Sequence, residues 1–168
     1  DFMLRKRKGI QNKLPIVGPE NENYWAFGDS YNKGAWALHT LRHVINNDTL
    51  WWETLKSFTQ QHAKSNVNTQ DFISHVEDKT KLNLDYFFEQ YFFDKRIPTL
   101  EYFQEGDKLH YKWTDTVSGF TMPINVEING LEKRLFPKTE KQIESIDQYS
   151  VVHFKDWQFL FNKKIIQM

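Results

Sequence analysis

Several features are missing from this sequence of 168 residues, and each absence removes a class of protein. Without cysteine the chain can form no disulfide bond, thiolate metal site or cysteine nucleophile. No apolar run approaches the roughly 20 residues that a membrane-spanning helix needs. Lys plus Arg and Asp plus Glu balance at 22 each, so no overall field attracts nucleic acid or anionic lipid. No internal repeat or low-complexity tract is present.

Aromatic residues, by contrast, are abundant. The chain contains 14 Phe, 7 Tyr and 6 Trp, and its 39% hydrophobic and 26% charged residues are typical of a globular protein rather than a disordered one. Its length suits one ordinary domain or two small ones. The sequence opens at Asp1-Phe2-Met3 without a start methionine or a signal peptide, so we expect it to begin inside a longer polypeptide.

Helical periodicity dominates the first half of the chain. Residues 1–30 are polar and irregular, with at most a short helix at the start, and residues 31–97 follow helical spacing. Pro98 stops helix propagation. The pattern predicts four helices. The first runs from Tyr31 to Ile45 with Ser30 or Asp29 as its cap, and Asn46-Asn47-Asp48 ends it and caps the second, which has Trp51, Leu55 and Phe58 inward. The third has Thr69 as its N-cap, and the fourth runs from Asn83 to Phe93.

Period-two alternation replaces helical spacing in residues 98–168. Asn129-Gly130 is a strong hairpin signal between two strand-like runs. Further strands are predicted at Thr99–Gln104, Leu109–Trp113, Ile124–Ile128, Leu131–Phe136, Lys141–Ile146, Tyr149–Phe154 and Gln158–Ile165, and the predicted interior residues are Leu109, Tyr111, Trp113, Ile124, Val126 and Ile128. The predicted fold class is therefore α+β in two parts, a helical bundle segment followed by a small antiparallel β-sandwich.

Two histidines, His39 and His43, have the i, i+4 spacing of a zinc protease helix. However, Thr40 stands where the general-base glutamate would follow the first histidine, and Arg42 beside the second opposes a dication. The other four histidines are scattered. We therefore predict polar-face histidines and no metal ligand in this chain.

Nucleic-acid binding and nucleophilic catalysis find little support. The basic run Arg5–Lys8 has no second basic cluster near it, so a solvated segment is the favoured interpretation. The aromatic rings of Phe87 to Phe92 lie at core spacing rather than forming a stacking platform. Neither a glycine-rich phosphate loop nor a serine nucleophile elbow is present, so residue chemistry alone gives no complete active site.

One segment is more specific. The stretch Tyr31-Asn32-Lys33-Gly34-Ala35 resembles the Tyr-x-Lys-Gly-Ala motif of the zinc aminopeptidases related to aminopeptidase N, the gluzincins. The resemblance covers about residues 15–135 well and the last strands loosely, although Tyr91 stands where the family usually has Trp. Its other matching segments are Thr69-x-Asp71-Phe72, Leu84-x-x-Phe87-Phe88-x-Gln90-Tyr91, Ile97-Pro98-x-Leu100 and Phe120-x-Met122-Pro123-Ile124.

The resemblance implies a division of the chain and a site. Residues 1–30 would be an irregular tail of the catalytic domain, 31–97 its helical C-terminal part and 98–168 a β-sandwich domain. The family's zinc motif, His-Glu-x-x-His with a distant Glu, would lie before Asp1, so this chain would be a C-terminal fragment. Zinc would belong to the full-length parent, with none in this chain, and the parent would act on peptides.

The resemblance also assigns one catalytic residue. In the family the motif tyrosine, here Tyr31, donates its hydroxyl to the oxyanion of the tetrahedral intermediate, where a fixed donor stabilises charge that appears only in the transition state. The alternative is a non-catalytic interaction module made of helices and a sandwich, in which Tyr31 is an ordinary surface tyrosine. A His-Glu-x-x-His motif in the coding sequence upstream would decide between the two.

Overall fold

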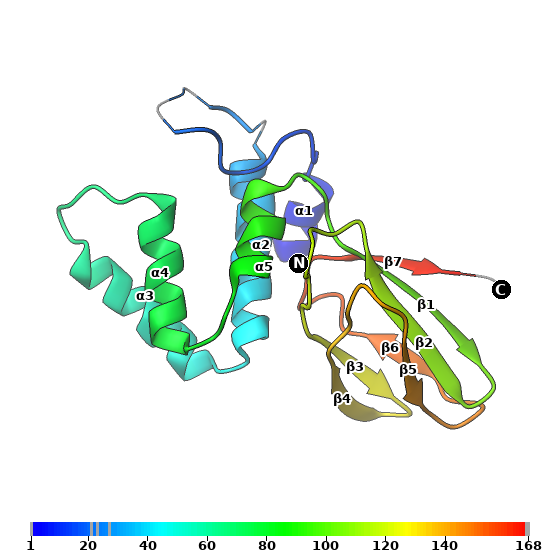
Figure 1. Cartoon of the computed structure of the whole chain (residues 1–168). Coiled ribbons are helices and arrows are strands. Elements are labelled where there is room, and N and C mark those ends of the chain that lie inside the picture. The colour runs from blue at the N-terminus through cyan, green and yellow to red at the C-terminus, as the bar shows by residue number, and fades with distance from the viewer. Residues whose placement is uncertain (1, 21, 23, 27, 167–168) are drawn as a thin grey trace.

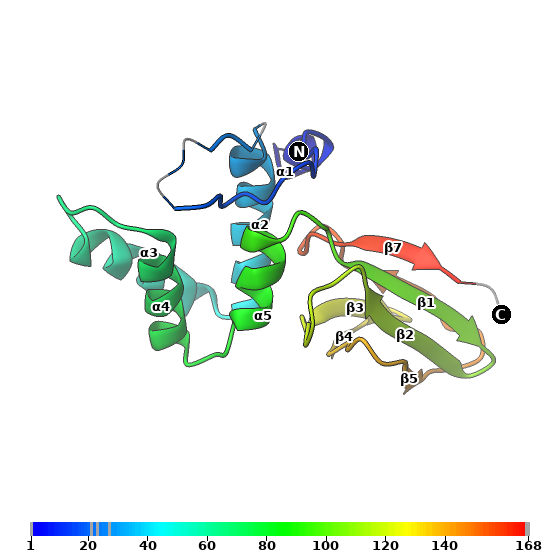
Figure 2. The same cartoon turned by 45° about the horizontal axis from the view of Figure 1, so that its top comes forward.

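A computed structural model describes residues 2–20, 22, 24–26 and 28–166. The helices gather at one end of the molecule and the strands at the other (Figure 1). Both Figure 1 and Figure 2 show the α3–α4 pair outermost, α2 beside α5 in the middle, and the sheets beyond them. The α+β fold with a helical segment before two sheets is confirmed. Positions 1, 21, 23, 27, 167 and 168 of the predicted ranges 1–30 and 98–168 lie outside the described residues.

The helices follow the predicted order with small shifts at their ends. A seven-residue helix forms near the start, and the last predicted helix divides into one α-helical turn and one turn of π-helix. The α-helices are α1 (Phe2–Lys8), α2 (Asp29–Ile45), α3 (Asp48–Gln61), α4 (Thr69–Thr80) and α5 (Asp85–Phe88), and the π-helical turn is η1 (Glu89–Phe93).

The start of α4 corrects one prediction. Asn68, not Thr69, is the N-cap, because its side-chain oxygen accepts a hydrogen bond from the Asp71 N–H at 2.9 Å. The Asp71 carboxylate in return accepts the Asn68 N–H at 2.8 Å. This reciprocal capping box satisfies two backbone donors that the first turn of a helix leaves unpaired.

Among the described residues, seven strands form two stacked sheets (Figure 2). One sheet has the order β5-β2-β1-β7 and the other the order β4-β3-β6. The β1–β7 pair is parallel, which differs from the purely antiparallel sandwich that the sequence predicts. The strands are β1 (Thr99–Glu105), β2 (Lys108–Thr114), β3 (Ile124–Ile128), β4 (Leu131–Leu135), β5 (Gln142–Ser145), β6 (Val152–Phe154) and β7 (Asn162–Ile165).

The β3–β4 hairpin has the predicted turn. Asn129 and Gly130 both have positive φ, 52° and 82°, as a type I′ turn requires, and Ile128 pairs with Leu131 across it. The alternation fixes the inward face, because side chains of one strand point to opposite sides. Five of the six predicted interior residues are buried and Ile128 is half-buried, so the predicted register is correct.

Helices and sheets share one continuous apolar core. The segment 159–161 before β7 lies in its middle, with every side chain fully buried. The Leu160 N–H donates to Thr40 Oγ1 on α2 at 2.9 Å, and the Tyr91 hydroxyl of η1 donates to the Leu160 carbonyl. The sandwich is therefore joined to the helices by buried hydrogen bonds as well as by packing.

The basic run of α1 is partly structural. The Arg7 guanidinium lies 5.6 Å from the ring centroid of Trp36 and donates to the carbonyl oxygens of Asp156 and Phe161. Arg7 is therefore part of the packed structure rather than of a solvated segment.

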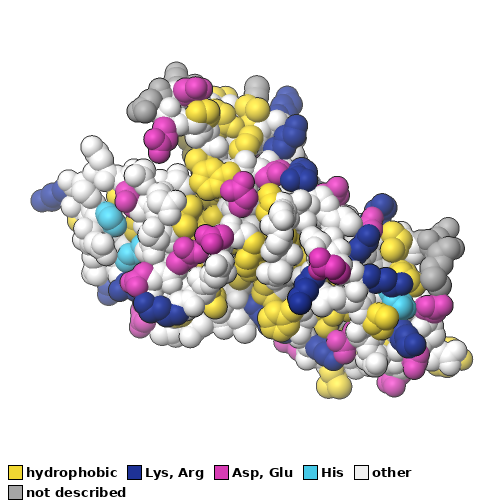
Figure 3. Space-filling model, viewed as in Figure 1, with side chains coloured by type: hydrophobic (Ala, Val, Ile, Leu, Met, Phe, Trp, Pro, Cys, Tyr) yellow, Lys and Arg dark blue, Asp and Glu magenta, His cyan; other side chains and the backbone are white. Residues whose placement is uncertain are grey.

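On the face shown in Figure 3, positive and negative side chains are interspersed. None of the helices in the described part of the chain is long and apolar enough to cross a membrane.

Candidate functional site

The entry into α2 is built around a buried carboxylate. Gly28 precedes the helix with a φ of 85°, a left-handed conformation that glycine adopts without steric cost. Asp29 follows it and is buried. Its carboxylate accepts the N–H of Gln11 at 2.9 Å and that of Asn12 at 2.7 Å. These bonds fix the first turn of α2 against the segment that follows α1.

Tyr31 lies in this first turn and points away from the core. Its side chain is 66% exposed, although its backbone N–H donates to the Gly28 carbonyl at 3.0 Å. Within the described residues its hydroxyl makes no hydrogen bond. The helix start therefore holds the backbone of Tyr31 in place, while the phenol stays available to a partner outside the core.

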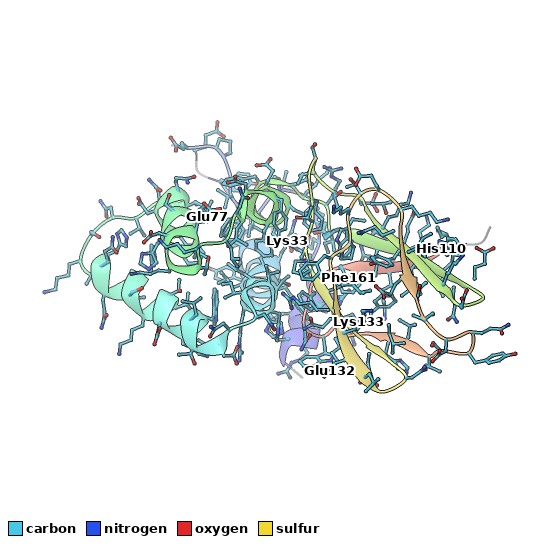
Figure 4. The ribbon with its side chains drawn as sticks, turned by 60° about the horizontal axis from the view of Figure 1, so that its bottom comes forward. Lys33, Glu77, His110, Glu132, Lys133 and Phe161 are labelled. Carbon is cyan, nitrogen blue, oxygen red and sulfur yellow. The ribbon has the colours of Figure 1, made fainter. Side chains whose placement is uncertain are left out.

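Lys33 is the residue of the motif that the structure buries completely. Its side chain has no exposed surface, and Nζ donates to the carbonyl oxygens of Asp94 at 2.7 Å and Lys95 at 3.0 Å. Burial lowers the pKa of Lys33 to about 8, against the opposing effect of the Asp94 and Asp29 carboxylates. Figure 4 places Lys33 between α2 and the neighbouring helix. Lys33 thus joins the Tyr31 turn to the segment after η1.

The sequence predicts Ser30 or Asp29 as the N-cap of α2, but the N-cap is Gly28, and neither the burial of Asp29 nor that of Lys33 is predicted. The signal is present in the helical spacing, because Lys33, Ala37, Thr40, Leu41 and Val44 form one i, i+3, i+4 stripe, and all are buried. A charged residue inside an apolar stripe predicts a buried charge with partners of its own.

Gly34 follows on the same helix and has room around it. A Cβ built there would lie 3.9 Å from Ile16 Cδ1 and 4.0 Å from the Asp29 carbonyl oxygen, which are ordinary contact distances. The described neighbours of Gly34 therefore do not require a glycine, although a glycine within a helix costs stability.

His39 and His43 lie together on α2 with their ring centroids 4.7 Å apart. His39 Nε2 is 3.1 Å from the Trp157 carbonyl oxygen, and His43 Nε2 is buried without a hydrogen-bond partner. Burial is the main reason that the pKa of His43 falls to about 4, and nearby His39 lowers it further. Arg42, between them in sequence, forms an ion pair with Asp48 at 2.6 Å.

These histidines do not form a metal centre with a third residue. Among the described residues no group of three or more His, Asp or Glu side chains could hold a metal ion. A zinc site needs three or four such ligands. The residues that the structure describes therefore do not fit a zinc ion.

A large hollow beside the helices does not include Tyr31. It has a volume of about 680 Å³ and lies where α4, α5 and η1 meet the loop before β3. Tyr86, Phe88 and Phe93 form its aromatic wall, and Asp85 and Glu89 add two carboxylates. Tyr31 thus stands on an open surface of the described residues rather than inside a closed pocket.

Comparison with known proteins gives a family profile and a fold. Residues 5–91, just over half of the chain, match the profile of the Peptidase family M1 domain. The structure is similar to the crystal structure of Legionella pneumophila aminopeptidase A in complex with aspartic acid, with a TM-score of 0.69 and 18% sequence identity. The similarity covers 94% of this chain but only 21% of that one. No curated protein sequence matches the chain.

Proposed function

The chain belongs to peptidase family M1, and from this premise we propose that it is part of a zinc-dependent aminopeptidase in which Tyr31 acts on the substrate. The family is that of the zinc aminopeptidases, so the resemblance carried by the Tyr31 segment is confirmed at the family level. The proposed substrate is a peptide, from which the complete enzyme removes the N-terminal residue.

The exposed Tyr31 hydroxyl is the observation that carries this proposal. Its phenol is 66% exposed, and within the described residues the hydroxyl has no internal partner. When a nucleophile adds to a peptide carbonyl, negative charge develops on the carbonyl oxygen. A hydroxyl held at that position by a rigid helix start donates a hydrogen bond to the oxyanion more strongly than to the ground-state carbonyl.

The neighbours of Tyr31 keep this donor in position. Asp29 fixes the first turn of α2 to Gln11 and Asn12, and Lys33 fixes it to the carbonyl oxygens at 94 and 95. Preorganisation of this kind matters because a misplaced donor loses much of its effect on the transition state. Asp29 and Lys33 are positioning residues in this proposal.

Zinc has no site among the described residues, so we derive no step through it from this chain. In the proposed parent the metal ligands come from residues outside this chain, and zinc supplies a Lewis acid for the same reaction. Metal analysis of the 168-residue chain tests this division. Less than stoichiometric zinc after dialysis is expected, and stoichiometric zinc that is lost in His39→Ala would contradict the proposal.

The decisive experiment is Tyr31→Phe in the complete enzyme, assayed on an aminoacyl anilide at saturating substrate. Loss of one oxyanion donor lowers kcat by about 10²–10³, with KM nearly unchanged because the bond forms in the transition state. Tyr149→Phe is the matched control, since Tyr149 is 88% exposed on a turn of the sandwich. If Tyr31→Phe keeps more than about half of the parent kcat, Tyr31 is not an oxyanion donor. The alternative, a non-catalytic interaction module, would then be favoured.

A further inference from the structure

A histidine ring lies where α2 meets the sandwich. This contact region, the α2 interface, is formed by α2, by residues 157–160 before β7 and by Arg134 of β4. It lies on the side of α2 that faces the sheets (Figure 1 and Figure 2). The ring centroid of His43 is 5.8 Å from that of Phe159 and 6.0 Å from that of Trp157. The His43 ring is therefore part of the packing that joins the helices to the sandwich.

One nitrogen of this ring has no partner. Within the described residues, His43 Nε2 is buried and makes no hydrogen bond. A neutral imidazole tolerates this arrangement, because Nε2 can be the nitrogen that carries no proton. A protonated imidazole does not, because both of its nitrogens carry an N–H and the ring carries a positive charge. A buried N–H without an acceptor and a buried charge without a counter-ion each destabilise the closed interface.

The helices give His43 no free counter-ion. The His39 ring lies 4.7 Å away between centroids, and its Nε2 is 3.1 Å from the Trp157 carbonyl oxygen. The Asp48 carboxylate at the start of α3 is the acid that faces the ring. Arg42 already binds this carboxylate through two hydrogen bonds, at 2.8 and 2.6 Å. The only negative charge near the ring on the helical side is thus neutralised by a guanidinium.

The sandwich adds a second cation. Arg134 donates to the carbonyl oxygens of His43 at 3.0 Å and Val44 at 2.8 Å, and within the described residues it forms no ion pair. Residues 157–159 carry no ionisable side chain. Two guanidinium groups and one carboxylate therefore face the ring, so the surroundings of His43 are already positive before it takes up a proton.

We propose that His43 is a pH sensor at the α2 interface: the neutral ring keeps the interface closed, and uptake of a proton in mildly acidic solution shifts it towards an open form in which the sandwich separates from α2. In the open form both ring nitrogens can donate to water, and the ring moves away from Arg134. The change is reversible, because the ring loses the proton and packs again when the pH rises.

The direction of the effect follows from the pKa of His43. Burial and the neighbouring positive groups lower it to about 4 in the closed form, whereas the ordinary value of 6.5 applies once the ring reaches water. The closed form is therefore fully stable above pH 6.5 and loses stability as the pH falls from 6.5 towards 4. At pH 5 these two values raise the ratio of open to closed molecules about thirtyfold over its value at pH 7.5.

Hydrogen exchange of the 168-residue chain at pH 7.5 and 5, corrected for the intrinsic exchange rate, tests the proposal. The Leu160 N–H reports on the α2 interface, because it donates to Thr40 Oγ1 at 2.9 Å. The Trp113 N–H is the reference within the sandwich, since it donates to the Lys138 carbonyl oxygen at 2.7 Å. We expect opening at Leu160 to increase about thirtyfold at pH 5 and opening at Trp113 to change little. Equal increases at the two amides would indicate unfolding of the whole chain and would overturn the proposal.

Variants assign the effect to one ring. His43→Phe keeps an aromatic ring against Phe159 and Trp157 and removes the titrating nitrogens, so protection of the Leu160 amide should be the same at both pH values. His43→Gln takes its place if the Phe variant does not fold. His153→Phe is the matched control, because His153 is exposed on β6, and it should keep the full pH effect.

A measurement on the unaltered chain completes the test. Titration of isotope-labelled histidines by NMR gives the pKa of the His43 ring directly, and we expect it well below that of the exposed His153. A His43 pKa near 6.5, or a pH effect at Leu160 that persists in the His43 variants, would overturn the proposal.

Discussion

The ammonium of Lys33 donates a hydrogen bond to the main-chain carbonyl oxygen of Asp94 across 2.7 Å, inside a part of the protein that water does not reach. This bond connects α2, which carries Tyr31, to the segment after η1 that leads into the sandwich. It places a buried positive charge two residues along α2 from the proposed catalytic residue, Tyr31. Its cost and its pH dependence can both be measured.

The stability of the chain should rise with pH between about 8 and 10.5 because of Lys33. The pKa of Lys33 is about 8 in the folded chain, below its ordinary value of 10.5, so the unfolded chain holds the proton more tightly in this range. Stability therefore increases as pH rises through the folded pKa, by roughly 3 kcal/mol at most. Urea unfolding at closely spaced pH values measures this slope.

Lys33→Met is the control that isolates the effect. The variant should be less stable than the parent, since it leaves the carbonyls at 94 and 95 without their donor. Its stability should nevertheless change less between pH 8 and 10.5. Equal pH profiles for the two proteins would show that Lys33 titrates in the same way in the folded and the unfolded chain.

Gly34→Ala should stabilise the isolated chain by about 0.5–1 kcal/mol. The substitution lowers the entropy of the unfolded chain and favours the helix, and the added Cβ meets atoms no closer than 3.9 Å. Thermal unfolding of the two chains measures the gain. In the complete enzyme, the same variant tests whether residues outside this chain pack closely against Gly34. Such packing would make Gly34→Ala destabilising instead of stabilising. A destabilised isolated chain would contradict the geometry around Gly34.

Val126→Asp should destabilise the chain by roughly 3 kcal/mol or more. Val126 is fully buried on β3 between Lys133 of β4 and Phe154 of β6, so a carboxylate there loses its contact with solvent, and the ammonium of Lys133 is already paired with Glu144. Leu131→Asp is the matched control at a site that is 75% exposed in the same sheet, and it should change stability little. If both variants unfold at the same denaturant concentration, the inward face of β3 is not the one assigned.

The sequence predicts the presence and order of the helices better than the residues at which they begin and end. Periodicity places apolar residues but does not choose between adjacent capping residues, so it favours Thr69 even though the sequence contains the Asn68-x-x-Asp71 pattern of a capping box. The sequence does not predict the π-helical turn η1, for a different reason. Residues three and four apart share a face in an α-helix, and Phe87, Phe88, Tyr91 and Phe92 meet that spacing whether or not one turn is wider.

Other features depend on contacts that no local pattern encodes. The exposed residues of β7 give no apolar alternation, so its parallel pairing with β1 could not be read from composition. Arg7 lies within a basic run, which is typical of a solvated face, yet it contacts Trp36 and the carbonyls of a segment about 150 residues later. The burial of His110 likewise depends on its stack with Phe103 across the sheet.

The contact between Arg7 and the segment 156–161 has a consequence for the order of folding. The helix at residues 2–8 packs against α2, where Trp36 Nε1 donates to the Met3 carbonyl oxygen at 2.7 Å, but the bonds of Arg7 to the carbonyls of Asp156 and Phe161 cannot form before the strand region is in place. Contacts of such high sequence separation pay a large loop-closure entropy before they stabilise anything, and they slow folding. The helices α3 and α4, which pack mainly against each other, can form early, whereas closure of the common core must wait for residues 159–161 to arrive.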